Sequence, residues 1–251
     1  MSKAITVRSL MTLEEFDDCV ELEEAVWGYD PSDMIPRRVF LVASRIGGQV
    51  LGAYDGERMV GFAMALPGYR NGHAYLHSHM LGVREEYRNA GLGRSLKLAQ
   101  RDDALARGFE LMEWTFDPLQ IKNAHLNISK LGAISRRYAH DFYGASSSPL
   151  QGGLPTDRVY AEWWLRSERV KRALAGEPPK IEVVERVEVP AAIHAWKASE
   201  TDRVKAREVQ TRNAAALESA FARGLAVVGY ERGELGDGSF LLGVFEEGLE
   251  Y

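Results

Sequence analysis

The stretch YLHSHMLGVREEYRNAGLGR, residues 75–94, combines a strand, a glycine-spaced turn and the start of a helix. His77 and His79 alternate with apolar residues, which is the period of a β-strand with two different sides. Gly91 and Gly93 follow, and the apolar spacing after them predicts a helix. Because a helix start leaves N–H groups unpaired and carries partial positive charge, this turn is suited to a phosphate or pyrophosphate.

The turn has two further features of an anion site. Glycines lack a Cβ atom and let the backbone approach a ligand closely. Arg88 and Arg94 add positive charge at the two ends of the turn. Its spacing is neither that of a P-loop nor that of a dinucleotide-binding fingerprint.

The composition is that of an ordinary globular protein. The 251 residues are 45% hydrophobic and 27% charged, which is enough for one large domain or one domain with an appendage. The net charge of −5 disfavours nucleic acid and anionic lipid as partners. The single cysteine, Cys19, falls in a helical pattern, and we expect a buried small hydrophobe in a reducing compartment. No apolar run approaches the ~20 residues of a membrane span, so we expect a soluble cytoplasmic protein without a membrane partner.

The order of the predicted elements indicates an α/β or α+β sheet domain covered by helices. A capping box of Thr12 and Glu15 marks one helix start, and Asp55-Gly56 marks a hairpin turn. The patterns predict strands at 5–10, 73–83 and 110–116, hairpins at 49–66 and 225–247, helices at 12–28, 37–48, 91–108 and 123–132, and an antiparallel pair formed by 135–144 and 158–166.

The last third of the chain follows a stretch whose composition is typical of a linker. Gly176-Glu177-Pro178-Pro179 is typical of a linker. We therefore predict a catalytic domain at 1–170, a linker at 171–180 and a C-terminal extension at 181–251 built from a strand, a helical stretch and the terminal hairpin. The edge of that hairpin could pair with another subunit, which would make the protein a homodimer.

The strand, turn and helix together resemble the GNAT family, the Gcn5-related N-acetyltransferases. The resemblance rests on Leu81-Gly82-Val83, on Tyr87 and on the turn itself, and the element order matches over residues 5–167. It implies a mixed, mostly antiparallel sheet flanked by helices. It also implies that Leu81 and Val83 contact the pantetheine arm and thioester of acetyl-CoA or another acyl-CoA. The coenzyme A pyrophosphate would bind at Arg88, Asn89, Ala90, Gly91, Leu92, Gly93 and Arg94.

The two histidines occupy the place where this family often carries its catalytic base. His79 lies four residues before Val83 and His77 lies six residues before it. This spacing is similar to that of the arylalkylamine N-acetyltransferases, which implies a proton relay through water. An aliphatic amine is neutral in only about one part in 10³ at pH 7, so a nearby base of pKa near 7 would assist its attack. The alternative is that one or both rings only form hydrogen bonds in a packed core, and a bulge would separate their faces.

The sequence departs from the family at the general acid. Ile128 occupies the position of the usual tyrosine and has no proton to donate. Tyr138 is our candidate acid, Tyr143 and Ser129 are alternatives, and the thiolate could also leave without help. Asn123 could face the bound thioester as part of the coenzyme A site, although a helix N-cap is the commoner role for such a residue.

These residues predict an acyl-CoA-dependent N-acyltransferase that acts on the amine of a small molecule such as an amino acid. Acetyl-CoA is the expected donor, and succinyl-CoA remains open. No group of residues has metal-ligand spacing, so we expect no metal. Two alternatives remain: a protein or peptide N-acetyltransferase, and a non-catalytic module that binds coenzyme A.

Overall fold

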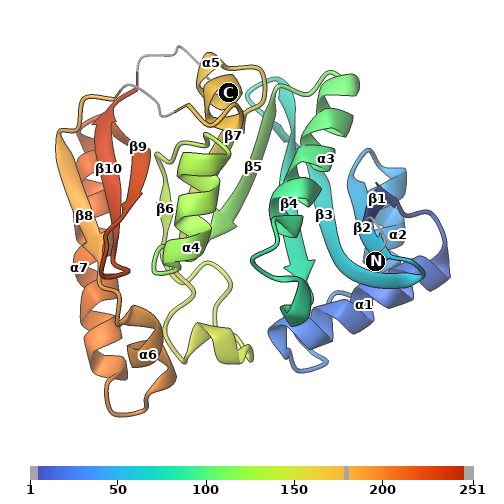
Figure 1. The fold of residues 1–251 in the computed structure, drawn as a ribbon, viewed down its shortest axis with the longest axis horizontal. Coiled ribbons are helices and arrows are strands. Elements are labelled where there is room, and N and C mark those ends of the chain that lie inside the picture. Colours follow the sequence, from blue (N-terminus) through green and yellow to red (C-terminus); the bar gives the residue numbers. More distant parts are fainter. Residues whose placement is uncertain (1–4, 178–180, 246–251) are drawn as a thin grey trace. The chain divides into compact units, whose positions relative to one another are not determined.

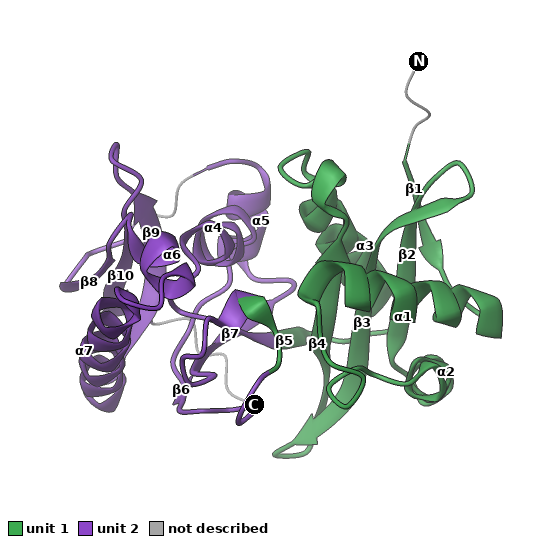
Figure 2. Ribbon diagram, turned by 90° about the horizontal axis from the view of Figure 1, so that it is seen from below, with its two compact units in different colours: residues 1–113, 147–149, 251 green, residues 114–146, 150–250 purple. Residues whose placement is uncertain are grey.

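The computed structural model describes residues 5–177 and 181–245, which form two compact units. The chain passes from one unit to the other inside strand β5 (Leu111–Phe116). The first unit contains the residues up to Glu113 together with Ser147–Pro149, and the second contains the remaining described residues (Figure 2). The order of the helices and strands along the chain can be followed in Figure 1.

The division between the units does not follow the predicted boundaries at 170 and 181. The second unit contains the described part of the predicted linker and of the extension. Helix α5 (Glu168–Leu174) extends into the first residues of the predicted linker. Residues 178–180 of the linker lie outside the described residues. The domain boundaries themselves stay a prediction.

The first unit is a sheet with helices on both faces, as predicted. Its strands are hydrogen-bonded in the order β1-β2-β3-β4-β5, and every pair is antiparallel except β4 with β5. Besides β5 the unit contains β1 (Thr6–Ser9), α1 (Leu13–Trp27), α2 (Arg37–Arg45), β2 (Gln49–Asp55), β3 (Arg58–Arg70), β4 (His73–Val83), the short 3₁₀ helix η1 (Glu85–Tyr87) and α3 (Leu92–Ala106).

Helix α1 begins and ends where the sequence predicts. The Thr12 hydroxyl accepts the Glu15 N–H, and the Glu15 carboxylate accepts the Thr12 N–H, so the capping box is confirmed. The helix ends at Gly28, whose φ of 59° is the left-handed conformation that glycine adopts without strain.

Strand β3 is longer than predicted and forms a second hairpin with β4. The sequence pattern ends β3 near residue 66, whereas the strand continues to Arg70 and pairs with β4 from Gly61 to Arg70. Asn71 and Gly72 form the turn, and both have positive φ, as a two-residue type I′ turn requires. The Asn-Gly dipeptide was the signal for this turn, and it brings Arg70 opposite His73.

Helices of the first unit cover its sheet (Figure 2), and two buried clusters pack between the sheet and these helices. Successive residues of β2 point to opposite faces: Val50 and Tyr54 belong to one cluster, Leu51 and Ala53 to the other. The first cluster packs against α1 and α2 and includes Cys19, which confirms the expected buried hydrophobe. The second packs against α3.

The second unit contains two groups of strands. The end of β5 lies next to β7 (Arg158–Trp164), and β7 pairs antiparallel with the short β6 (Tyr138–Ala139), as expected for the strand pair. A separate antiparallel sheet has the order β8-β10-β9 and contains the terminal hairpin. The remaining elements are α4 (Ile121–Ala124), the π-helix η2 (His125–Lys130), the 3₁₀ turn η3 (Pro149–Gln151, which begins in the first unit), α5, β8 (Glu185–Val189), α6 (Ile193–Ala198), α7 (Arg203–Ala222), β9 (Leu225–Arg232) and β10 (Gly238–Val244).

A bridging segment explains why the predicted extension belongs to the second unit. Ile134 forms a β-bridge with Glu162 of β7, and the next residue, Ser135, forms one with Val227 of β9. Two successive residues therefore connect the family-like strand pair to the C-terminal sheet.

A polar network lies inside the first unit between α3 and β4. Lys97 is 5% exposed, and its Nζ donates to the Ser78 hydroxyl over 2.7 Å. The Ser78 hydroxyl in turn donates to Oε1 of Gln100 over 2.9 Å. Burial lowers the pKa of Lys97 well below its ordinary value, because the charged amine loses its hydration.

We expect this buried lysine to make stability depend on pH. Its pKa is lower in the folded than in the unfolded chain, so the unfolded chain binds more protons between the lowered value and about 10.4. The free energy of unfolding therefore rises with pH across that window, by up to ~1.4 kcal/mol per pH unit. Chemical denaturation between neutral pH and pH 10 should show this slope in the wild type and a flatter profile in Lys97→Met. Parallel profiles in the two proteins would contradict a neutral Lys97.

Candidate active site

Strand β4 carries the two candidate bases, and their rings lie close together. Its residues alternate regularly in burial, with Leu76, Ser78 and Met80 buried and the two histidines partly buried between them. A bulge does occur, since Met64 pairs with Met80 and the next residue of β3 pairs with Ser78. The histidine rings nevertheless lie near each other, with centroids 6.2 Å apart. The predicted pair is therefore brought together within the first unit.

The two rings have different electrostatic surroundings. Burial, with a further contribution from His77, lowers the pKa of His79 to about 4. His79 is consequently neutral at pH 7 and holds a proton only weakly. His77 has a carboxylate as neighbour: its Nδ1 lies 3.7 Å from Oε1 of Glu113 on β5. Of the two rings, His77 is the one with this carboxylate contact.

Glu113 and its partner Arg70 were not among the predicted site residues. Glu113 sits in a strand whose other residues are mostly apolar, and its side chain is only 3% exposed. Nη2 of Arg70 lies 3.0 Å from Oε2 of Glu113. A buried carboxylate needs such a counter-charge. A glutamate in a mostly apolar strand was therefore a sign of a buried ion pair. The sequence alone does not identify the cation of that pair.

The predicted pyrophosphate turn has the backbone that such a site needs. Gly91 is the N-cap of α3 with a φ of 82°, and no side chain caps the helix. Asn89 also has positive φ, at 62°. The Gly91 carbonyl accepts the Ser95 N–H over 3.0 Å, which starts the helix, while a Cβ built on Gly91 would meet nothing within 4 Å. The first turn of α3 therefore presents backbone N–H groups beside open space, which fits an anion.

The other predicted coenzyme A residues surround this turn in the first unit. Leu81 and Val83 lie at the end of β4, where they pair with Ala63 and Gly61 of β3. The Arg88 guanidinium donates to the Val83 carbonyl over 3.2 Å, which ties the start of the turn to the end of the strand. The turn continues through Ala90, Leu92, Gly93 and Arg94 into α3. The arrangement fits the pyrophosphate end of coenzyme A, and the individual contacts stay predictions.

Asn123 and Ile128 lie in the second unit. The N-cap interpretation of Asn123 is wrong: α4 begins at Ile121 with Gln120 as N-cap, and Asn123 is inside the helix. Its Oδ1 accepts from Nδ2 of Asn127 over 3.2 Å. The helix then widens into the π-helix η2, a local change of period that a simple helical pattern does not reveal. Asn123 as a coenzyme A contact stays a prediction.

Ile128 is buried, and the alternative acid Ser129 is already engaged. The Ile128 side chain is 1% exposed in the second unit. The Ser129 hydroxyl donates to the Tyr230 carbonyl over 2.6 Å. Ser129 would have to give up this bond to protonate a thiolate.

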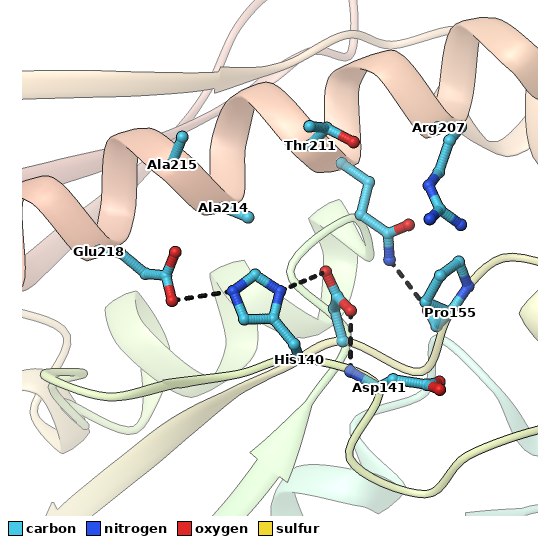
Figure 3. Close-up of a pocket in the computed structure, with 10 residues that line it drawn as sticks. His140, Asp141, Pro155, Arg207, Thr211, Ala214, Ala215 and Glu218 are labelled. Atoms are coloured by element: carbon cyan, nitrogen blue, oxygen red, sulfur yellow. Dashed lines mark hydrogen bonds and ion pairs between the residues drawn. The ribbon is translucent and has the colours of Figure 1, made fainter.

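Tyr138, the candidate acid, also lies in the second unit, beside a network of carboxylates. Its hydroxyl donates to Oδ2 of Asp157 over 2.7 Å, and burial together with this bond raises its pKa. His140 lies between Asp157 and Glu218, with Nε2 2.9 Å from Oε1 of Glu218 (Figure 3). Asp157 also accepts the Asp141 N–H, so the network fastens the loop that joins β6 to β7. Tyr138 must break its bond to Asp157 before it can serve as an acid, and this role stays a prediction.

The same network forms one wall of a cavity in the second unit. The cavity measures about 490 Å³ and is lined on its other side by α7, including Arg207 and Thr211 (Figure 3).

The described residues show neither a cluster of metal ligands nor a membrane-spanning helix. They contain no group of three or more histidine, cysteine, aspartate or glutamate side chains that could hold a metal ion. None of their helices has both the length and the apolar character needed to cross a membrane.

Comparison with protein families identifies the domain that carries the strand and turn. The family model described as acetyltransferase (GNAT) family matches residues 13–127. Residues 13–127 are a GNAT-family domain. The family assignment, predicted from the Arg88–Gly93 turn, is therefore confirmed. Among curated proteins, no sequence matches the chain.

Solved structures with this fold confirm the fold class. The ribosomal-protein-S18-alanine N-acetyltransferase of Escherichia coli is 15% identical, with a TM-score of 0.52 over 65% of this chain and 96% of that one. The yncA protein of Salmonella typhimurium, solved with its cofactor acetyl-CoA, is 17% identical, with a TM-score of 0.53 over 66% and 96%. The NatC complex bound to Gag peptide and CoA contains a chain that is 16% identical, with a TM-score of 0.51 over 64% and 98%. At these identities the likeness concerns the fold.

Proposed function

We propose that this GNAT protein is an N-acyltransferase that moves the acyl group of an acyl-CoA to the amine of a small molecule such as an amino acid. Acetyl-CoA is the expected donor, with succinyl-CoA as the second candidate. The observation that carries the proposal is a partly buried histidine pair on β4, the strand that leads into the uncapped glycine turn of α3. A base and an anion site thus lie on consecutive elements of the first unit.

The turn would hold the coenzyme. The N–H groups at the start of α3 would bind the pyrophosphate, with Arg88 and Arg94 adding positive charge. Backbone groups of Leu81 and Val83 would run along the pantetheine arm and polarise the thioester carbonyl, an interaction worth a few kcal/mol per donor in comparable sites. Bound acyl-CoA supplies an activated carbonyl carbon.

The histidines would act as the general base that accepts a proton from the acceptor amine. A protonated amine has no lone pair, so it must first lose one proton, at a cost of ~4–5 kcal/mol at pH 7. As the neutral nitrogen then bonds to the carbonyl carbon, His77 accepts the proton that the nitrogen loses. His79 is neutral because its pKa is about 4, so it can relay the proton from the amine to His77. The carbon–sulfur bond then breaks, and the thiolate takes up a proton from Tyr138 or from water. A thiolate is a modest base, so a dedicated acid is not essential.

A second candidate keeps the reaction but changes the acceptor to a protein or peptide amine. It is supported by two structural neighbours: one is the ribosomal-protein-S18-alanine N-acetyltransferase, and the other is the NatC complex bound to a peptide. A third candidate is a module that binds coenzyme A without turnover, which Ile128 in place of the usual tyrosine favours.

Release of free thiol distinguishes these candidates. The wild-type chain is mixed with acetyl-CoA or succinyl-CoA and with a panel of amino acids, aliphatic and aromatic amines, and peptides with free N-termini. We expect acceptor-dependent release with at least one small amine and none with the peptides. Release with peptides alone would move the proposal to the protein acceptor, and coenzyme A binding without release would support the non-catalytic module.

A further inference from the structure

A carboxylate lies beside the proposed base on the neighbouring strand. Glu113 of β5 is the direct partner of His77 of β4 in the parallel pairing, so the two side chains share one face of the sheet. Oε1 of Glu113 is 3.7 Å from Nδ1 of His77. The contact is longer than a hydrogen bond and within the range of a strong electrostatic interaction.

Arg70 of β3 completes the arrangement. Its Nη2 lies 3.0 Å from Oε2 of Glu113, and its Nη1 lies 3.4 Å from Oε1. The guanidinium also stacks over the Tyr75 ring, 4.8 Å from the centroid, which fixes its direction. Oε1 of Glu113 therefore faces two groups, the Arg70 guanidinium and Nδ1 of His77.

We propose that Glu113 is a positioning residue that holds His77 with its proton on Nδ1, which leaves Nε2 as the atom that accepts the amine proton. A carboxylate oxygen beside Nδ1 favours the tautomer that carries its proton there and stabilises the imidazolium formed on proton uptake. Arg70 supplies the counter-charge of the buried carboxylate and limits how strongly that carboxylate attracts the imidazolium. The inference rests on the proposed function, because it assigns the orientation of that reaction's base.

The charged and titratable groups around His77 act in opposite directions. Glu113 favours a proton on the ring and Arg70 opposes one, whereas the neighbouring His79 is neutral at pH 7. Removing the carboxylate and removing the guanidinium should therefore move the titration of the base in opposite senses. A purely structural role of the Arg70–Glu113 pair predicts no such opposition.

Two variants of the full chain test the proposal, with a matched control. Glu113→Gln removes the negative charge at nearly constant shape, Arg70→Met removes the positive charge, and Glu110→Gln makes the same change as the first at an exposed site three residues away. Nitrogen-15 NMR of the histidines reports the tautomer of His77 without any need for turnover. We expect the Nδ1–H form in wild type, Arg70→Met and Glu110→Gln, and a mixture of tautomers in Glu113→Gln.

Kinetics with the acceptor found for the wild type supply the second readout. Glu113→Gln should lower kcat by about tenfold to a hundredfold, with KM for acyl-CoA unchanged. It should also move the acid limb of the pH profile to lower pH, while Arg70→Met moves it to higher pH. An unchanged tautomer, or limbs that move in the same direction, would overturn the positioning role. A wild type that acylates no amine would instead overturn the proposed function, and the NMR result would still decide whether Glu113 orients His77.

Discussion

Replacing His77 by glutamine is expected to lower kcat/KM for the amine acceptor by about 10²- to 10⁴-fold, the range typical of a lost general base. The side chain is partly buried on β4 and has Glu113 as an electrostatic partner. Glutamine keeps a polar group there but cannot take up a proton near neutral pH. Steady-state kinetics over a range of pH, together with equilibrium binding of acetyl-CoA, measure the effect.

The control for this variant lies on the same strand. His73→Gln changes an exposed histidine at the start of β4, beside the Asn71-Gly72 turn, and should leave the rate unchanged. The coenzyme should bind with wild-type affinity in both proteins. A His77→Gln protein with wild-type kcat/KM would show that this ring is only a packing residue.

Replacing Gly91 by alanine is expected to weaken binding of coenzyme A by about tenfold or more. A residue with a Cβ atom is strained at a φ of 82° by about 1–2 kcal/mol, so the start of α3 must shift or bear that cost. The shift moves the backbone N–H groups that we assign to the pyrophosphate. Isothermal titration with coenzyme A measures the loss.

Gly108 gives a matched control at the other end of α3. Its φ of 85° is nearly the same, and a Cβ built there also meets nothing within 4 Å. Gly108→Ala should therefore lower the stability of the protein as much as Gly91→Ala and leave coenzyme A binding intact. Equal losses of affinity in the two variants would mean that Gly91→Ala acts through stability alone.

The local parts of the fold were predictable because short-range physics determines them. The pattern of β4 predicted a strand at 73–83, which is the observed element, and the Thr12–Glu15 capping box placed the start of α1. Capping, glycine conformations and the two-residue strand period all depend on neighbours in the sequence. The glycine turn is also a local feature of the sequence, and it predicted the family.

The parts that depend on distant neighbours were not predictable in the same way. Lys97 is a buried residue of α3, and its amine donates a hydrogen bond to Ser78 of the neighbouring strand. No local sequence pattern indicates this polar network. The sequence shows Glu113 only as a charged residue in an apolar strand, and its contacts with Arg70 and His77 become visible only in the folded structure. Asn123 has the residue type of an N-cap, but the helix begins earlier and widens into a π-helix.

The stoichiometry of acyl transfer tests the central claim most directly. Acyl-CoA with an isotopically labelled acyl group is incubated with the wild-type chain and its best amine acceptor, and thiol release and labelled product are measured in the same sample. We predict one N-acylated amine, identified by mass spectrometry, for each thiol released, with both products lost in His77→Gln. Coenzyme A that binds at the glycine turn without label reaching any amine would contradict the N-acyltransferase account.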